Sequence, residues 1–236
     1  MKVLSWTTGA ASLAERIFGG TCYLCRGQSQ RSLCLPCSAD LPYLPSPRCP
    51  RCALPTTGKL LCGRCLADQP AYDATIAVYA YGFPADVLIH GLKFRSELAL
   101  APLLGGALYE EICKGSAGKI DLVVPVPLHD VRLKERGYNQ SMEIARCITA
   151  RVGAPLLSDV CIRVRNTAAQ LGLPLKERRE NVRGAFSCRR GLDGASVAVV
   201  DDVMTTGATL NELAGTLKKF GAARVVNWVV ARTPDH

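Results

Sequence analysis

The sequence has no long hydrophobic run. Although 48% of its 236 residues are hydrophobic, no stretch approaches the ~18 consecutive apolar residues that a membrane-spanning helix requires, so we expect no insertion into a membrane. Low-complexity segments are missing, and so are internal repeats of roughly 20–50 residues, apart from the paired cysteines described below. This composition, with 21% charged residues, is that of a globular protein with one ordinary domain and a small second one.

A convincing secretion signal is also missing at the N-terminal end. The apolar residues there are interrupted by hydroxyl side chains and then by Glu15 and Arg16, whereas a signal peptide needs an unbroken apolar centre. Leu13, Ile17 and Phe18 fall on one side of a helical pattern, so this stretch predicts a short helix. We therefore expect a cytoplasmic protein.

Cysteine, by contrast, is abundant. Eight of the twelve cysteines form four C-x-x-C pairs within 44 residues. Each pair presents two sulfurs to one ion, and two pairs complete a tetrahedral zinc site in which no position stays open for catalysis. We expect structural zinc that supplies most of the folding free energy of this segment. The predicted ligands of the two ions are Cys22, Cys25, Cys34, Cys37, Cys49, Cys52, Cys62 and Cys65.

Other interpretations of the cysteines stay open. A disulfide framework would need an oxidising compartment, which the missing secretion signal disfavours, and a redox C-x-x-C normally occurs once beside a βαβ unit. We expect the first two pairs to share one ion and the last two pairs the other, although the spacing also allows a crossed arrangement. The remaining cysteines are predicted to be small buried hydrophobic residues; they are Cys113, Cys147, Cys161 and Cys188.

Acidic residues are outnumbered by basic ones, 20 to 29, which gives a formal net charge of +9. Each four-thiolate zinc site would carry a charge of −2, so two sites would lower the net charge to about +5. A surplus of this size attracts anions in general and does not by itself indicate a nucleic-acid partner.

The second part of the chain alternates strand-like and helix-like segments. This alternation predicts an α/β fold with a mostly parallel sheet and helices on both faces, in which a ligand binds beyond the carboxyl ends of the strands. We expect a zinc-ribbon module over residues 1–70 and the α/β domain over residues 71–236. Strands are predicted within 72–83, 121–127, 156–165, 196–202 and 224–232, and helices within 84–94, 98–115, 140–153 and 207–221.

Two adjacent acids end the strand predicted at 196–202. Asp201 and Asp202 repel each other and resist burial unless a positive or hydrogen-bonding group meets them. The turn that follows places threonine hydroxyls around Gly207, just before a helix. Unpaired amides and the helix dipole at such a place suit a phosphate, although the pattern is not a Walker loop. An ordinary N-capped helix is the alternative, but the paired acids favour a binding site.

This stretch resembles the phosphoribosyl-pyrophosphate (PRPP) signature of type I phosphoribosyltransferases. The resemblance implies that Asp201 and Asp202 bind the 2′- and 3′-hydroxyls of ribose. It also implies that the turn binds the 5′-phosphate, through Thr205, Thr206, Gly207, Ala208 and Thr209.

The chain as a whole is similar to the ComF family of competence-associated proteins. The zinc module, "GLKFR", "VVPVPLHDVRLKERGYNQSMEIAR" and "KERRENVRGAF" carry this resemblance, which covers nearly the whole chain. It implies a type I phosphoribosyltransferase-like fold behind a zinc-ribbon module, and an association with DNA uptake in natural transformation. The partners it implies are PRPP and, for an adaptor, single-stranded DNA and other DNA-uptake proteins.

The segment after the strand at 121–127 takes the place of the pyrophosphate-binding loop in the wider family. Its basic and amide side chains would donate to a diphosphate whose charge grows as it leaves. Arg136 is assigned to catalysis together with Asp201 and Asp202, whereas His129 is given no catalytic role. A solvated basic turn is the alternative. The other loop residues assigned to PRPP are Arg132, Lys134, Asn139 and Gln140.

A second basic segment, residues 163–190, carries eight basic residues against two glutamates. It suits a mobile cover over an anionic substrate or a surface that follows a nucleic-acid strand, with Phe186 as its single aromatic residue for base stacking. The sequence does not decide whether Lys93, Phe94 and Arg95 contact a ligand or pack at the end of a helix.

PRPP chemistry displaces pyrophosphate from C1 of ribose, with Mg²⁺ on the diphosphate. Family members that act on 6-oxopurines usually carry an Asp base three residues after the second acid, where this chain has Thr205, so we do not expect purine salvage. Two hypotheses stay open. One is a Mg²⁺-dependent phosphoribosyltransferase with an unidentified acceptor, and the other is an adaptor that senses PRPP or binds single-stranded DNA without catalysis.

Overall fold

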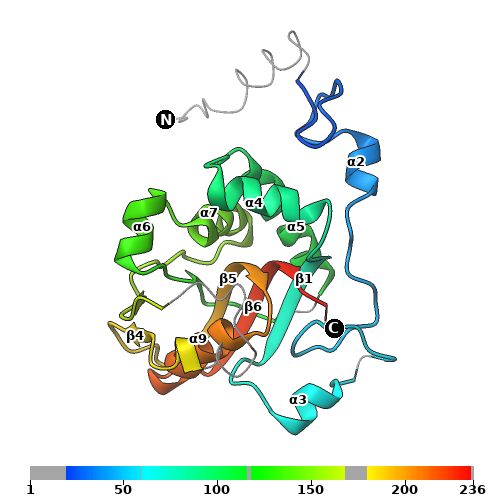
Figure 1. Ribbon diagram of the computed structural model, residues 1–236. Coiled ribbons are helices and arrows are strands. Elements are labelled where there is room, and N and C mark those ends of the chain that lie inside the picture. Colours follow the sequence, from blue (N-terminus) through cyan, green and yellow to red (C-terminus); the bar gives the residue numbers. More distant parts are fainter. Residues whose placement is uncertain (1–19, 59, 116–117, 168–179, 235–236) are drawn as a thin grey trace, which may run out of the picture.

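A four-stranded parallel sheet forms the centre of the computed structural model (Figure 1), which describes residues 20–58, 60–115, 118–167 and 180–234. The strand order is β1-β6-β5-β2, and all three pairings are parallel. Within the described ranges, the strands of this sheet are β1 (Ala74–Ala80), β2 (Leu122–Pro125), β5 (Ser196–Met204) and β6 (Arg224–Arg232).

The strands are buried on both faces, as their nearly continuous apolar sequences predict. Every residue of β2 is buried. In β5, Val197 and Val199 contribute to one hydrophobic cluster, while Ala198 and Val200 contribute to the other. The sheet therefore lies between two cores, one on each face.

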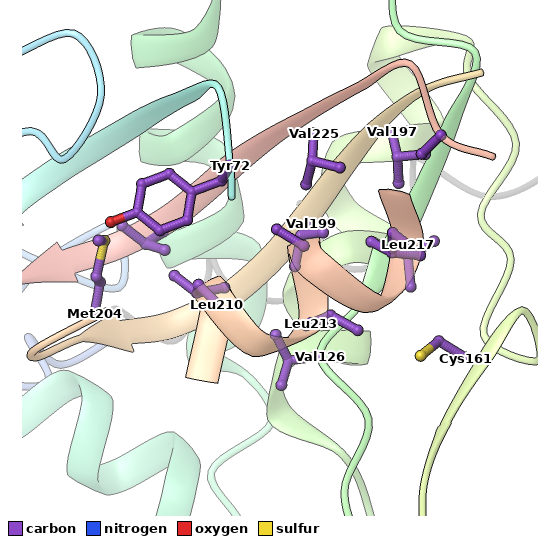
Figure 2. Close-up of a cluster of buried hydrophobic side chains, with 14 of the residues drawn as sticks. Tyr72, Val126, Cys161, Val197, Val199, Met204, Leu210, Leu213, Leu217 and Val225 are labelled. Atoms are coloured by element: carbon purple, nitrogen blue, oxygen red, sulfur yellow. The ribbon is translucent and has the colours of Figure 1, made fainter. Parts of the chain in front are cut away.

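Helices cover both of these faces. One face packs against α4 (Ala85–Phe94), α5 (Leu100–Lys114) and α7 (Gln140–Val152), and the other packs against α9 (Ala208–Lys219). Figure 2 shows the second core, where leucines of α9 meet valines of β5 and β6. The predicted α/β class, with a mostly parallel sheet and helices on both faces, is confirmed.

The cysteine-rich segments contribute to both cores. Cys22 and its neighbours join the core under α4 and α5, whereas Cys49 and Cys52 join the core under α9. These segments include two short helices, α2 (Leu35–Ala39) and α3 (Gly63–Ala67). The sheet is thus flanked by one cysteine-rich unit on each face.

Arg48 fastens the cysteine-rich part to the sheet and to α5. Its guanidinium donates to the carbonyl of Ala77 in β1 at 2.7 Å and pairs with Glu111 of α5. Burial acts to raise the pKa of Glu111, but hydrogen bonds from Arg48 and Lys114 outweigh it, so the pKa is lowered.

The strand predicted within 156–165 does not join the central sheet. It forms β3 (Cys161–Arg163), which pairs antiparallel with β4 (Phe186–Cys188) as a separate ribbon. Cys161 of this three-residue strand is buried in the core under α9. A single bridge between Leu156 and Val123 is the contact of this stretch with β2.

The other predictions for the single cysteines and the helices have mixed outcomes. Cys161 and Cys188 are buried opposite each other in β3 and β4, as small hydrophobic residues would be. Cys113 is exposed, contrary to prediction, because it lies on the solvent side of the last turn of α5. The helix predicted around Leu13 and Ile17 lies outside the described residues. Within the described part of the chain, no helix combines the length and hydropathy needed to cross a membrane.

Candidate functional site

Two groups of four cysteine sulfurs are arranged to hold one metal ion each. Within each group, the sulfurs all lie within 4.8 Å of one another. The Sγ atoms of Cys25 and Cys34 are 3.7 Å apart, and those of Cys52 and Cys62 are 3.5 Å apart. A tetrahedral zinc ion with Zn–S bonds of about 2.3 Å requires sulfurs about 3.8 Å apart, so both groups fit structural zinc. The first zinc site is Cys22, Cys25, Cys34 and Cys37, and the second is Cys49, Cys52, Cys62 and Cys65, which confirms the sequential pairing.

The paired acids lie buried near the carboxyl end of β5, with Asp201 8% and Asp202 3% exposed. Oδ1 of Asp201 accepts hydrogen bonds from Oγ of Ser141 at 3.0 Å and from the backbone N–H of Asp202 at 2.9 Å. Oδ2 of Asp202 lies 2.8 Å from Nζ of Lys93. Helices α4 and α7 thus supply the positive and hydrogen-bonding groups that the buried acids require.

These partners set different protonation equilibria for the two carboxyl groups. Burial, followed by the charge of Asp202, raises the pKa of Asp201 to about 7. Burial also acts to raise the pKa of Asp202, but attraction to Lys93 and their hydrogen bond outweigh it and lower the pKa. Near neutral pH, Asp202 is therefore an anion paired with Lys93, while Asp201 is partly protonated.

The turn between β5 and α9 is held in a conformation that only glycine adopts easily. Gly207 has φ of +81° and caps α9. A Cβ atom there would lie 2.7 Å from Cε of Met204 and 3.1 Å from the hydroxyl of Tyr72. The N–H of Ala208 donates to Oγ1 of Thr206 at 3.2 Å. We call residues 204–209 the phosphate loop, because residues 205–209 within it are the ones predicted to bind phosphate.

A cavity of about 320 Å³ lies between the phosphate loop and the second zinc site. Thr206, Gly207 and Ala208 line it from the loop, and Cys52 and Cys65 line it from the zinc side. Because the first turn of α9 borders this cavity, backbone amides and the positive end of the helix dipole are close to whatever occupies it.

Arg232, at the end of β6, connects the phosphate loop to the second zinc site. Its side chain is almost fully buried at 1% exposed. Nε donates to the carbonyl of Cys52 at 3.0 Å, and Nη1 donates to the carbonyls of Met204, at 3.2 Å, and of Thr205. One guanidinium therefore holds a zinc-ligand backbone and the loop backbone together.

The segment predicted to bind diphosphate contains a helix, α6 (Asp130–Arg136), before α7 begins. Asn139 caps α7, because its Oδ1 accepts from the N–H of Ser141 at 3.0 Å, and its Nδ2 donates to the carbonyl of Val126 at 3.0 Å. Gln140 is buried, and its Oε1 accepts from Nη1 of Arg136 at 2.5 Å. The structure thus uses both amides to orient the backbone and Arg136.

Basic side chains gather between α6 and the acids. Nη2 of Arg132 donates to the carbonyl of Thr167 at 3.3 Å, and Arg163 donates to the hydroxyl of the same residue. Burial and the nearby charge of Arg132 lower the pKa of Arg163, against an opposing attraction from Asp201. Lys134 is exposed on α6.

His129 caps the start of α6, where its Nδ1 accepts from the N–H of Val131 at 3.3 Å. This contact gives the histidine a structural use in the loop.

The basic segment 163–190 offers no aromatic platform for bases in its described part. Phe186 is 6% exposed, and the guanidinium of Arg163 lies over its ring at 5.5 Å from the centroid. The ring belongs to the core under α9, so the single aromatic residue of this segment is not available for base stacking. Residues 168–179 lie outside the described residues, and this range includes Lys176, Arg178 and Arg179.

The sequence indicates the acids but not the groups around them. It leaves Lys93 open between two roles and gives no sign that Ser141 meets Asp201. Arg232, which holds the phosphate loop, and Arg163, one of several basic residues in its segment, are likewise not singled out by the sequence. The signal available for Lys93 was electrostatic, since two buried acids require a nearby cation.

Comparison with known proteins gives matches over both parts of the chain. A family model described as a double zinc ribbon domain matches residues 13–66. The chain is 35% identical over 222 residues to the DNA utilization protein YhgH of Salmonella typhimurium, covering 91% of this chain and 97% of that protein. It is 31% identical over 226 residues to competence protein F of Haemophilus influenzae, covering 91% of this chain and 98% of that protein.

Among solved structures, the glutamine PRPP amidotransferase of B. subtilis, complexed with ADP and GMP, aligns with 55% of this chain. The aligned part is 25% of that enzyme's own chain, with 26% identity and a TM-score of 0.38.

Proposed function

Since the chain belongs to the ComF family of competence and DNA-utilization proteins, we propose that it binds PRPP and transfers its phosphoribosyl group to an acceptor during the handling of incoming DNA. The observation that carries this proposal is the buried acidic pair on β5, neutralised by Lys93 and followed directly by the turn at Gly207 and the N-terminus of α9. Ribose hydroxyls and a phosphate require these two features side by side.

The ribose end of the proposed site consists of Asp201 and Asp202. Their carboxyl oxygens would accept hydrogen bonds from the 2′- and 3′-hydroxyls of the sugar, which can replace water at this buried edge. Lys93 keeps Asp202 ionised and therefore a strong acceptor. Ser141 fixes the orientation of Asp201 from α7.

The 5′-phosphate would bind at the phosphate loop. Its oxygens would accept from backbone amides at the start of α9 and from the hydroxyls of Thr205 and Thr209. The αL conformation of Gly207 lets the backbone approach the ligand closely.

In the proposed reaction, the bond between C1 of ribose and the diphosphate oxygen breaks and its electron pair leaves with the diphosphate. The acceptor atom bonds to C1 and releases its proton. Arg132, Arg136 and Lys134 would donate to the departing diphosphate as its negative charge grows. Asn139 and Gln140 would act by orienting this segment, since Gln140 holds Arg136.

Magnesium would enter this site as part of the substrate. The groups of three or more metal-ligating side chains within the described residues are the two cysteine sets, so this part of the chain offers no separate cage for Mg²⁺. This ion usually keeps several waters and binds substrate phosphates, and the diphosphate of PRPP supplies them. We therefore write the substrate as Mg²⁺·PRPP.

Calorimetric titration of Mg²⁺·PRPP into the zinc-loaded protein tests the proposal. We expect saturable binding that is lost in the Asp201→Asn, Asp202→Asn double variant. A Lys119→Ala variant is the matched surface control, because Lys119 is 89% exposed and pairs with Asp121, away from the acidic pair. Absence of binding to the wild-type protein would refute the proposal. Binding that survives in the double variant would show that the two acids do not take part in binding PRPP.

Binding of single-stranded DNA without catalysis is the second candidate function. It is favoured by Phe94, which is 57% exposed at the end of α4 and has the guanidinium of Arg136 at 5.4 Å from its ring centroid. An exposed ring beside cations is what base stacking along a strand uses. Fluorescence anisotropy with a labelled oligonucleotide should then show affinity that falls steeply with salt and drops in Phe94→Ala. Salt-insensitive or absent binding would refute it.

We place this activity in the cytoplasm. Eight cysteines arranged as zinc ligands must stay reduced to hold the metal, and this condition is met in a reducing compartment. Other DNA-uptake proteins would be the partners there.

A further inference from the structure

The second zinc site carries an arginine at the same position of each C-x-x-C turn. Arg51 lies between Cys49 and Cys52, and Arg64 lies between Cys62 and Cys65. The two arginines have the same charge and the same distance along the chain from zinc ligands, but they contact different parts of the protein.

Arg64 reaches the phosphate loop, whereas Arg51 does not. Nη2 of Arg64 donates to the carbonyl of Thr206 at 2.9 Å. Nη1 of Arg51 donates to the carbonyl of Pro70 at 3.3 Å, in the connection that leads to β1. Arg64 lies in α3, which begins directly after the zinc ligand Cys62 and contains the zinc ligand Cys65.

Arg64 completes a series that Arg232 begins. Arg232 holds the carbonyls of Met204 and Thr205, and Arg64 holds the next carbonyl, that of Thr206. Three consecutive carbonyls of the phosphate loop are therefore bound by guanidinium groups. Both guanidiniums are tied to the second zinc site, one through the carbonyl of Cys52 and the other through α3.

Holding these carbonyls also orients the amides that would contact a phosphate. A peptide unit is planar, with its C=O and N–H directed oppositely, so the carbonyl of Thr206 fixes the direction of the N–H of Gly207. The cavity beside the loop is lined by Arg64 and Cys65 from one side and by Gly207 from the other. Loss of Arg64 would remove the hydrogen bond that holds the peptide plane between Thr206 and Gly207, and this plane could then rotate.

Tyr72 lines the same cavity beside the loop. It is 4% exposed, and its hydroxyl lies 3.1 Å from the place that a Cβ atom would take at Gly207. The Tyr72 side chain therefore packs closely against the backbone that Arg64 holds.

We propose that Arg64 is a positioning residue of the phosphate loop, and that the second zinc site is thereby a working part of the ligand site. The loop presents its amides correctly only while the zinc-bound turn holds Arg64 in place. The first zinc site, which packs on the opposite face of the sheet, has no such role. The identity of the ligand as PRPP rests on the function proposed above, but the contact between Arg64 and the loop does not.

The first test follows the loop itself and needs no ligand. In ¹⁵N-glycine-labelled full-length protein, the amide resonance of Gly207 can be assigned by its loss in Gly207→Ala. We expect this resonance to shift or broaden in Arg64→Ala and to stay in place in Arg51→Ala, with two zinc ions per chain in both variants. Arg64→Lys, which can still donate one hydrogen bond, should give an intermediate result. An unchanged Gly207 resonance in Arg64→Ala, or an equal change in Arg51→Ala, would overturn the proposal.

The second test measures Mg²⁺·PRPP affinity in the same variants. Loss of a hydrogen bond from a charged donor predicts binding about tenfold weaker in Arg64→Ala, with Arg51→Ala within about twofold of wild type, and equal affinities in the two variants would overturn it. If the wild-type protein binds no PRPP, the proposed function fails while the Gly207 resonance still decides the role of Arg64.

The dependence of the Gly207 conformation on each of the two zinc sites can be tested separately. Cys62→Ser and Cys34→Ser each alter the first ligand of a second C-x-x-C turn, in the second and first zinc site respectively. Only Cys62→Ser should reproduce the Gly207 change of Arg64→Ala, and the same change in Cys34→Ser would refute the site-specific role.

Discussion

Replacing Asp201 by Asn should stabilise the ligand-free protein at pH 8, although the same change should abolish PRPP binding. Asp201 has its pKa raised from 3.8 to about 7, chiefly by burial. At about 1.4 kcal/mol for each pKa unit, the roughly three units amount to a cost of about 4 kcal/mol for ionising this group in the folded protein. Asparagine carries no charge and avoids that cost.

The real gain should be smaller, at about 2 kcal/mol. The amide oxygen of Asn can still accept from Ser141 and from the N–H of Asp202, as Oδ1 of Asp201 does. However, the amide nitrogen needs a new acceptor at a buried position, and an unmet donor costs about 1–3 kcal/mol. The variant therefore gains stability only at pH values at which Asp201 is ionised in the unfolded wild-type chain.

The sign of the pH dependence follows from the raised pKa. Between pH 4 and pH 7 the folded protein binds a proton at Asp201 that the unfolded chain has released, so wild-type stability falls as pH rises through this range. The advantage of Asp201→Asn should therefore be largest at pH 8, smaller at pH 5 and absent below about pH 4.

Urea unfolding of the zinc-loaded wild type and variant at pH 8 and pH 5 measures this directly. Asp202→Asn is the matched control, because it leaves Lys93 without its anion and should destabilise the protein at both pH values. If Asp201→Asn is no more stable than wild type at pH 8, or if its advantage does not shrink by pH 5, the electrostatic reasoning is wrong.

Three further changes should have measurable effects. Gly207→Ala should lower the free energy of unfolding by about 1–3 kcal/mol in urea titrations, because φ is +81° and the new Cβ meets neighbouring atoms; no loss would contradict this conformation. Glu111→Gln should cost about 1–2 kcal/mol near pH 7. Since the pKa of Glu111 is lowered in the folded protein, this contribution is present above the unfolded pKa and is lost as pH falls through the folded pKa, so a stability difference that does not shrink as the pH is lowered below the unfolded pKa would refute it. Elemental analysis should find two zinc ions per chain, and a strong chelator should cause loss of structure in the cysteine-rich segments by circular dichroism, whereas an unchanged spectrum after metal removal would contradict structural zinc.

The sequence was enough to predict the features that are local in the chain. The C-x-x-C spacing predicted two four-cysteine sites, because each turn must place two sulfurs within a few residues, and the structure groups the cysteines in the expected sequential order rather than the crossed one that the spacing also allows. The apolar run at 121–127 predicted a strand buried on both faces. Asp201 and Asp202, at the end of another apolar run, predicted a binding site because such acids have no reason to be buried otherwise.

What the sequence did not predict depends on contacts between distant segments. Lys93 meets Asp202 across more than a hundred residues, and no spacing rule links α4 to β5. Asn139 caps α7 in the structure, a role that the sequence does not indicate, and its contact with PRPP stays a prediction. Phe186 is the single aromatic residue of a basic segment, and the pairing of β3 with β4 turns its ring into the core. For Lys93 and Phe186, tertiary packing decides between roles that the same side chain can fill.

The position of β6 has a consequence for how the protein is made. This strand comes last among the described strands, yet it lies in the interior of the sheet between β1 and β5. While the chain is emerging from the ribosome, β1 has no neighbour in the sheet to pair with, and the joint that Arg232 forms with Cys52 cannot close. The cysteine-rich segments can bind zinc early, but the ligand site is assembled only when the final strand inserts. A ribosome stalled before residue 224 would therefore hold a metal-loaded chain with an exposed sheet edge, the kind of intermediate that chaperones recognise.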